Sequence, residues 1–452
     1  MFNKLEKLFM PLAEKIGKNK YLLSIRDGFL VSMPLLIAGS FFLLIANFPI
    51  PGWSDFWAGI FGDNWTKFMS KPTDATFAIM SIIVVMGIGY SFAGHMNVDK
   101  IFGAAISVVS FFLLMPYEVL VKGELLVSGT DMVVGGIPLK WVGSSGIFIG
   151  MIVAFLSVHI YSFAVKRGWV IKMPDGVPPT VTQSFAALLP ATFVIFIFFL
   201  INIAFSLTSY NNAFNFVYQM LQIPLLNLGN SLWAMIIAYL LLHMFWFFGV
   251  NGGSVVGAVY NPVLQTLSAE NLEAFRNGQE IPNLISQQFQ DLFATFGGAG
   301  STLSLLIAML FFCKSKRVKN LGKLSLVPGI FGINEPVIFG LPIVLNPIIF
   351  IPFLLVPTFN IVVSYIVMSI GLVPYPTGIP ITWTTPVVIS GFLSTGWQGA
   401  VLQIILLISG VFIYMPFIKM IDRQFLKEES EHENKVDEDD DISLDDLSFD
   451  DL

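Results

Sequence analysis

Long apolar runs dominate this chain of 452 residues, and several reach the ~20 residues that a helix needs to cross a membrane. They lie at about residues 29–48, 76–94, 101–117, 142–165, 183–209, 229–250, 295–313, 345–371 and 397–418. Only 12% of the residues are charged, against about 25% in a soluble domain. The sequence therefore predicts an all-α polytopic integral membrane protein and excludes an ordinary soluble or disordered one.

Basic residues indicate which side of the membrane each connection lies on, because cytoplasmic connections are enriched in Lys and Arg. They gather before Arg26, at 166–172, at 314–323 and at 423–427. We therefore expect both chain ends in the cytoplasm. Nine crossings cannot achieve this, so either a tenth crossing lies within 251–290 or one apolar run does not cross.

The two ends of the chain differ from the apolar body. Residues 1–28 carry apolar side chains at helical spacing with lysines between them, which predicts an amphipathic helix on the membrane surface. Residues 428–452 contain 13 of the 30 acidic residues and one of the 24 basic ones, which leaves 23 basic against 17 acidic residues elsewhere. We expect a disordered acidic cytoplasmic tail there. Within the body, 118–140 is polar with alternating Val and Gly, and we expect a hairpin.

Three apolar stretches are interrupted by Pro, Gly and Asn: 251–264, 328–347 and 373–396. Irregular backbone at membrane depth must be covered by protein or line a watery cavity, because unpaired N–H and C=O groups are costly in lipid. Discontinuous segments of this kind often form the binding sites of transporters. The alternative is that they are surface loops.

Glu335 is the only charged residue between Lys323 and Lys419. It lies in the broken run Gly-Ile-Asn-Glu-Pro, directly after Asn334. A carboxylate at mid-membrane costs about 2.5–3.5 kcal/mol on insertion scales, so we predict a buried polar site around it. The alternatives are a structural carboxylate at a helix end and a loop at the membrane interface.

Aromatic and amide side chains suggest the ligand. Residues 176–269 carry no Asp, Glu, Lys or Arg, and within them Trp246 precedes Asn251 and two glycines. Aromatic faces and amides suit a sugar, whose C–H faces stack on rings and whose hydroxyls need hydrogen-bond partners. His243, nearby, is either part of this site or a helix-packing histidine. Trp383, flanked by threonines, is either a cavity wall or an interfacial anchor.

Other chemistries lack a sequence signal. There is no Walker-type glycine loop, no metal-ligand spacing of His and Cys, and no basic–aromatic surface for nucleic acid. We expect no cofactor, no metal and no nucleic-acid partner. Cys313 is the single cysteine, and we interpret it as a buried apolar residue.

Taken together, these motifs resemble the membrane subunit, enzyme IIC, of the lactose/cellobiose family of bacterial phosphoenolpyruvate-dependent sugar phosphotransferase systems. The resemblance covers about residues 1–425. It is carried by Ile-Arg-Asp-Gly at 25–28, Met-Pro-Asp-Gly-Val-Pro-Pro at 173–179, Trp-Phe-Phe-Gly-Val-Asn-Gly at 246–252, Gly-Gly-Ala-Gly-Ser-Thr-Leu at 297–303, Gly-Ile-Asn-Glu-Pro at 332–336 and Trp-Thr-Thr-Pro at 383–386.

The resemblance implies a homodimer of ten-helix subunits in the bacterial inner membrane, with residues 29–210 on the dimer side. Residues 211–427 would bind a disaccharide such as cellobiose or diacetylchitobiose, using two re-entrant hairpins. Asn334 and Glu335 match the family's sugar-binding segment, where the glutamate lies near the 6-hydroxyl that is phosphorylated. The donor would be a phosphocysteine on a separate IIB protein, supplied by IIA and the phosphocarrier protein.

One position departs from the family. Members usually have Gly-Ile-His-Gly where this chain has Gly-Val-Asn-Gly at 249–252, so Asn251 keeps a hydrogen-bonding group but cannot take a proton. Two rival functions stay open at this point. One is a proton-coupled sugar transporter with Glu335 as the proton carrier, and the other is a sugar sensor that does not transport.

Overall fold

The computed structural model describes residues 18–440 apart from 122–130, Asp175, Pro342 and Leu345, together with Pro11 and Lys15. Its first half comprises α2 (Lys20–Ala46), α3 (Trp53–Phe61), α4 (Trp65–Phe77), α5 (Met80–His95), α6 (Lys100–Leu114), β1 (Glu118–Val121), β2 (Met132–Gly135), α7 (Leu139–Val142), η2 (Ser144–Gly146), α8 (Ile147–Lys166) and α9 (Pro179–Ser206). Its second half comprises α10 (Ala213–Val217), η3 (Tyr218–Gln222), α11 (Ile223–Gly229), α12 (Leu232–Phe247), α13 (Gly252–Arg276), α14 (Gln287–Phe289), η4 (Gln290–Ala294), η5 (Ala299–Ser301), α15 (Thr302–Phe312), α16 (Lys316–Ile330), α17 (Glu335–Gly340), α18 (Pro347–Ser369) and α19 (Ile389–Asp440).

Apolar helices confirm the predicted class. In the described part, 7 helices are long and apolar enough to cross a membrane, or up to 8 if the bent pair Ala213–Gly229 and Leu232–Phe247 forms one span. Helix α6 is apolar but shorter. The chain is thus a multi-pass helical membrane protein, and the expected total of about ten crossings stays a prediction.

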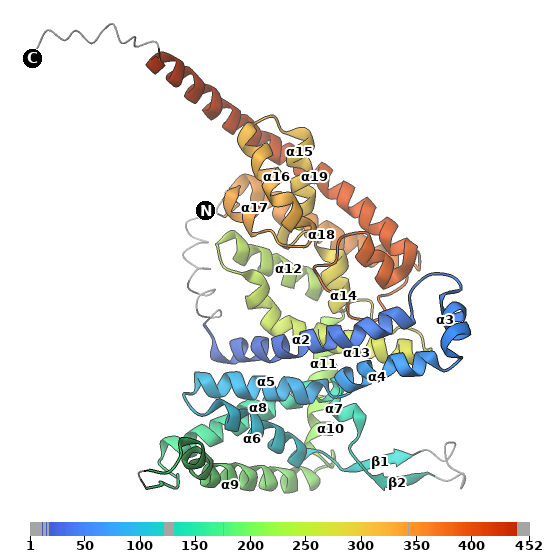
Figure 1. Ribbon diagram of the computed structural model, residues 1–452, viewed down its shortest axis with the longest axis vertical. Coiled ribbons are helices and arrows are strands. Elements are labelled where there is room, and N and C mark those ends of the chain that lie inside the picture. Colours follow the sequence, from blue (N-terminus) through green and yellow to red (C-terminus); the bar gives the residue numbers. More distant parts are fainter. Residues whose placement is uncertain are drawn as a thin grey trace, which may run out of the picture.

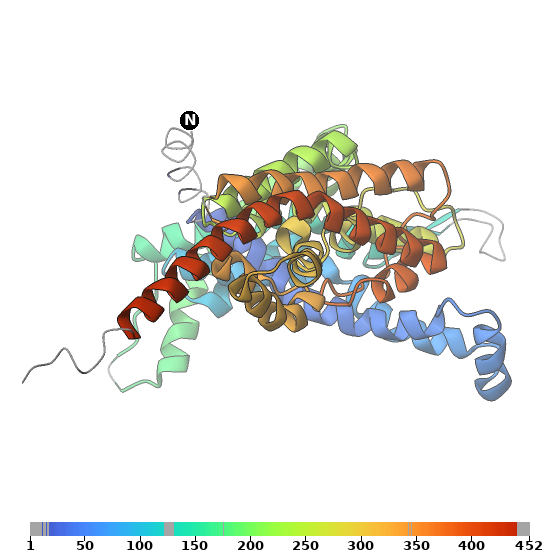
Figure 2. The ribbon, with the colours of Figure 1, turned by 90° about the horizontal axis from the view of Figure 1, so that it is seen from above.

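The helices form two groups that meet at α2 and α13. Helices α5, α6, α8 and α9 lie on one side of these two, and α15 to α19 lie on the other (Figure 1). Helix α2 contacts α5 and α4 in the first group and α13 in the second. Helices α18 and α19 run side by side (Figure 2). The boundary expected near residue 210 stays a prediction.

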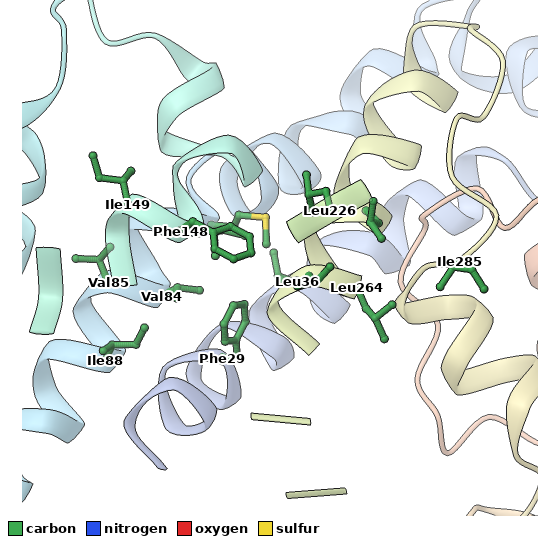
Figure 3. Close-up of a cluster of buried hydrophobic side chains, with 14 of the residues drawn as sticks. Phe29, Leu36, Val84, Val85, Ile88, Phe148, Ile149, Leu226, Leu264 and Ile285 are labelled. Atoms are coloured by element: carbon green, nitrogen blue, oxygen red, sulfur yellow. The ribbon is translucent and has the colours of Figure 1, made fainter. Parts of the chain in front are cut away.

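Small residues bring α2 and α5 into close contact. A Cβ atom added at Gly87 would lie 2.9 Å from the Cα atom of Gly28, so the two backbones approach as only glycines allow. Around this crossing lies a buried hydrophobic cluster that also includes residues of the second half (Figure 3). Its members include Phe29, Leu36, Val84, Val85, Ile88, Phe148, Ile149, Leu226, Leu264 and Ile285.

The segment 251–264 corrects one expectation, because it is not broken. It forms the first half of the continuous helix α13, with Pro262 inside it. Asn251 caps this helix by accepting a hydrogen bond from the Ser254 N–H at 2.9 Å. Neighbouring helices bury much of α13, including Pro262, and a covered helix tolerates proline at membrane depth. The sequence prediction gave proline too much weight as a helix breaker.

The other irregular segments are confirmed. Between Phe331 and Asn346 the described backbone is helical only in the six-residue α17, and 371–388 forms no helix or strand. The hairpin within 118–140 is also confirmed, since β1 pairs with β2 in antiparallel register, with Glu118 opposite Gly135.

The chain ends differ from expectation. Helix α2 already begins at Lys20, capped by Asn19, so residues 20–28 belong to the first candidate span, and most of the expected surface helix lies outside the described residues. At the other end, α19 continues to Asp440, so 428–440 are helical rather than disordered. Glu429 ties the start of this stretch to the start of α16, because its Oε1 accepts hydrogen bonds from Ser315 Oγ at 2.7 Å and from the Arg317 N–H at 2.9 Å. Residues 441–452 lie outside the described part.

Candidate sugar-binding cavity

A cavity of about 510 Å³ lies among α2, α12, the start of α13 and the two irregular segments 295–299 and 332–335. This volume is in the range typical of small-molecule sites. Five of the six predicted site residues line it: Trp246, Asn251, Asn334, Glu335 and Trp383. The structure thus brings together side chains that are up to 137 positions apart in the sequence.

Asn334 joins the two irregular segments. Its Nδ2 donates hydrogen bonds to the Ala299 carbonyl at 2.8 Å and to Thr302 Oγ1 at 3.1 Å. Gly298, which has a φ of 90°, makes this contact possible, since a Cβ atom there would lie 2.6 Å from Asn334 Cγ. The amide nitrogen of Asn334 therefore holds the cavity wall together, and its Oδ1 is the atom available to a ligand.

His243 does not line the cavity and is corrected to a positioning residue. The Gly300 N–H donates a hydrogen bond to its Nε2 at 2.8 Å, and its Nδ1 lies 2.7 Å from the Tyr239 carbonyl oxygen. A carbonyl only accepts, so Nδ1 carries the proton and the ring is neutral. His243, buried on α12, thereby fixes the glycine-rich turn that Asn334 also holds.

Glu335 is exposed to the cavity rather than buried, which corrects the expected environment. It is the first residue of α17, directly after its N-cap Asn334. Its carboxylate has no hydrogen-bond or ion-pair partner among the described residues. Exposure lets water hydrate the charge, so the carboxylate avoids the cost of burial and stays available to a ligand hydroxyl.

Two tryptophans provide apolar faces. Trp383 is 50% exposed, and its ring lies over Gly332, where a Cβ atom would be 2.9 Å from Cε3. The turn that carries it is closed by a hydrogen bond of 2.9 Å between the side-chain oxygens of Thr382 and Thr385. Trp246 lines the cavity from the last turn of α12.

Asn251 has two roles in this structure. Its Oδ1 is engaged in capping α13, so its Nδ2 is the group that remains for a ligand. An asparagine at this position therefore serves the helix start as well as the cavity wall.

The sequence prediction missed several polar cavity residues. Asp291 lines the cavity beside Gln290, and its Oδ1 accepts a hydrogen bond from Gln287 Nε2 at 3.0 Å. The sequence signal that could have indicated Asp291 is its position as an acidic residue four positions before the apolar run 295–313. Arg26 also lines the cavity, although the sequence indicated it only as a marker of topology and as part of the Ile-Arg-Asp-Gly motif.

Smaller chambers continue from the cavity toward the opposite end of α13. One of about 200 Å³ shares Asp291 and Trp383 with the cavity, and the next, of about 80 Å³, is lined mainly by apolar side chains such as Met80. Beyond it lies a polar chamber of about 360 Å³, where Arg276 of α13 forms an ion pair with Asp74 of α4. The small apolar chamber therefore lies between the cavity and the far end, since it shares Trp383 with the cavity and Phe77 with the polar chamber.

Cys313 lies at the end of α15 and is buried, as predicted. It packs in a hydrophobic cluster with Val318 and Ile418, so a phosphoryl donor has no access to its sulfur. This makes Cys313 unsuited to carrying a phosphoryl group.

Comparison with known proteins agrees with these features. Residues 26–357 match the family model described as "Phosphotransferase system, EIIC". The chain belongs to this family. Over 434 residues this EIIC chain is 42% identical to the lichenan permease IIC component of Bacillus subtilis, covering 95% of each protein. Over 429 residues it is 43% identical to the cellobiose-specific EIIC component of Geobacillus stearothermophilus, covering 94% of this chain and 95% of the relative.

A solved structure has the same fold. The transporter ChbC, the IIC component of the N,N'-diacetylchitobiose-specific phosphotransferase system, superimposes with a TM-score of 0.91 at 44% identity, covering 94% of this chain and 99% of ChbC. The EIIC chain is therefore a sugar permease of the lactose/cellobiose type of phosphotransferase system. A proton-coupled secondary transporter is not favoured.

Proposed function

We propose that this EIIC chain binds a β-linked disaccharide of the cellobiose or diacetylchitobiose type in the 510 Å³ cavity. The observation that carries the proposal is the carboxylate of Glu335, unpaired among the described residues, in a cavity whose wall includes two tryptophans and three asparagines. Indole faces stack on sugar C–H faces, and the amides and carboxylate pair with hydroxyls. The sugars for which the relatives are named support this class.

Glu335 orients the 6-hydroxyl for phosphorylation in this proposal. The phosphoryl group leaves the cysteine sulfur of phospho-IIB as the P–S bond breaks, and a bond forms between phosphorus and the sugar 6-oxygen. The hydroxyl loses its proton, and we assign Glu335 as the acceptor because its carboxylate has no partner among the described residues, whereas that of Asp291 accepts a hydrogen bond from Gln287. IIA and the phosphocarrier protein recharge IIB upstream.

Translocation proceeds by alternating access between the two helix groups. The cavity wall includes Arg26 and Asn251, near the ends of α2 and α13 that lie on the same side as the basic connection after α8 (Figure 1). The positive-inside rule assigns this side to the cytoplasm, along with both chain ends. The basic connections there provide a docking face for IIB. In this proposal the apolar chamber around Met80 restricts the outer path, because at about 80 Å³ it is smaller than the chambers of about 200 and 360 Å³ on either side of it.

We also propose a homodimer in the bacterial inner membrane, with the first half at the interface. Helix α9 supports this arrangement because it exposes an apolar face at the edge of that half (Figure 1). The exposed side chains include Leu188, Phe196 and Phe199.

The test is sugar uptake into sealed vesicles that contain the full chain and enclose phosphorylated IIB. We expect labelled cellobiose to accumulate as a sugar phosphate and an uncoupler to leave this accumulation unchanged. Uptake that needs a proton gradient instead of the phosphoryl donor contradicts the mechanism. A sensor would show no sugar counterflow in vesicles that lack IIB.

A further inference from the structure

Arg26 is the only basic residue among the described residues that line the cavity. The cavity wall also contains two acidic residues, Glu335 and Asp291. A phosphoryl group on the sugar brings about two more negative charges. Within a cavity shared with two carboxylates, such a product needs a nearby cation to offset the repulsion.

The guanidinium of Arg26 is held by one edge. Its Nε and Nη2 donate hydrogen bonds to Oδ1 of Asp27 at 3.0 and 2.8 Å. Asp27 is fixed in turn, because its Oδ2 accepts a hydrogen bond from Ser91 Oγ of α5 at 2.8 Å. The Nη1 edge of Arg26 has no partner among the described residues. A guanidinium fixed in this way presents its remaining donors to a ligand.

Stability does not account for this arrangement. The side chains of Arg26 and Asp27 are 38% and 35% exposed, and ion pairs at such positions contribute little to stability. The pair lies on α2, whereas Asn251 and Glu335 reach the cavity from the second half. A ligand that touches Arg26 and Glu335 together would therefore bridge the two helix groups.

We propose that Arg26 binds the phosphoryl group of the sugar 6-phosphate, with Asp27 and Ser91 as positioning residues. This inference rests on the proposed function, since it requires that the sugar is phosphorylated within the cavity. The unphosphorylated sugar does not need the arginine. Arg26 therefore distinguishes the product from the substrate.

The experiment compares two ligands on the purified full chain. Equilibrium binding is measured for cellobiose and for cellobiose that carries a phosphate on a 6-oxygen. We expect Arg26→Gln to change cellobiose affinity by less than about twofold and to weaken the sugar phosphate roughly 10- to 100-fold, the range for loss of a charge-assisted hydrogen bond. Arg26→Lys keeps the positive charge but not the forked guanidinium. Its affinity for the sugar phosphate should lie between that of the parent and that of Arg26→Gln.

Two further variants sharpen the comparison. Lys67→Gln removes an exposed basic residue of α4, outside the cavity, and should bind both ligands as the parent does. Asp27→Asn should weaken the sugar phosphate while leaving cellobiose binding in place. Single-turnover transfer from phospho-IIB should slow in Arg26→Gln even at saturating cellobiose.

The outcomes separate the two proposals. If Arg26→Gln binds the sugar phosphate as tightly as the parent, or loses both ligands equally, the assignment of Arg26 is overturned while the proposed function stands. If the parent binds cellobiose but not the phosphate, the assignment is likewise overturned. If the parent binds no cellobiose, the proposed substrate class itself fails.

Discussion

Asn251 allows the sugar contact to be separated from the helix cap, because different atoms of one side chain perform the two roles. Its Oδ1 caps α13 through the Ser254 N–H, and its Nδ2 remains for the sugar. Asn251→Ser keeps a capping oxygen and removes the amide. Asn251→Leu removes both, and Asn251→His offers a ring nitrogen to the sugar but is a poor N-cap.

The expected magnitudes follow from these roles. Loss of an N-cap costs about 1 kcal/mol of stability, so leucine and histidine should each lower the free energy of unfolding by about that amount and serine by much less. A buried hydroxyl left without its partner costs about 1–3 kcal/mol, which weakens sugar binding roughly 5- to 150-fold in leucine. Serine should weaken binding less, and histidine should retain most of it.

The assay pairs equilibrium cellobiose binding with thermal unfolding of the detergent-purified variants. We expect the two rankings to differ, since histidine binds well but unfolds early, whereas serine stays folded but binds less tightly. If leucine binds cellobiose as well as the parent does, Asn251 does not contact the sugar. If stability and affinity fall in parallel across all three variants, the two roles are not separate.

Three further predictions concern the surroundings of the cavity. His243→Ala should destabilise the chain by about 1–3 kcal/mol in thermal unfolding, because it leaves the buried Gly300 N–H unpaired; an unchanged melting temperature contradicts the positioning role. Arg276→Gln breaks the ion pair with Asp74 at the far end of α13. In a chain that also carries Met80→Cys, this change should increase labelling by an impermeant thiol reagent added outside. Equal labelling with and without Arg276→Gln refutes the restriction of the outer path at the chamber around Met80. A chain that ends at Glu428 should have a lower melting temperature than a chain that ends at Glu431, because only the longer chain keeps the carboxylate of Glu429. Both chains should keep sugar counterflow in vesicles. Equal melting temperatures would show that this carboxylate does not support the start of α16.

The sequence predicted those parts of the fold and site that depend on local composition. Apolar runs predicted the membrane helices, and one charge in a broken apolar segment predicted Glu335 as a cavity residue. The prediction of a broken segment at 251–264 was wrong, because burial by neighbouring helices keeps α13 continuous around Pro262. The helical tail was missed because Glu429 caps a helix more than one hundred positions earlier in the chain.

Long-range contacts explain why the sequence did not predict the remaining features of the site. The roles of His243 and Asn334 depend on the turn at 297–302, and no periodicity in the sequence indicates that these segments meet. The sequence did not predict Arg26 as a cavity residue, because its place in the cavity depends on how α2 packs against α13. Such pairings follow from tertiary packing and not from local sequence.

The central claim is that Glu335 contacts the sugar as it is phosphorylated. The most direct measurement is cellobiose binding and transfer from phospho-IIB in Glu335→Gln, with Glu431→Gln on the exposed part of α19 as the matched control. We predict that Glu335→Gln weakens binding roughly 10- to 100-fold and nearly abolishes transfer, because a charge-assisted hydrogen bond is lost while the fold is kept. Binding and transfer at the level of the parent, in a protein that melts at the same temperature, would contradict the account.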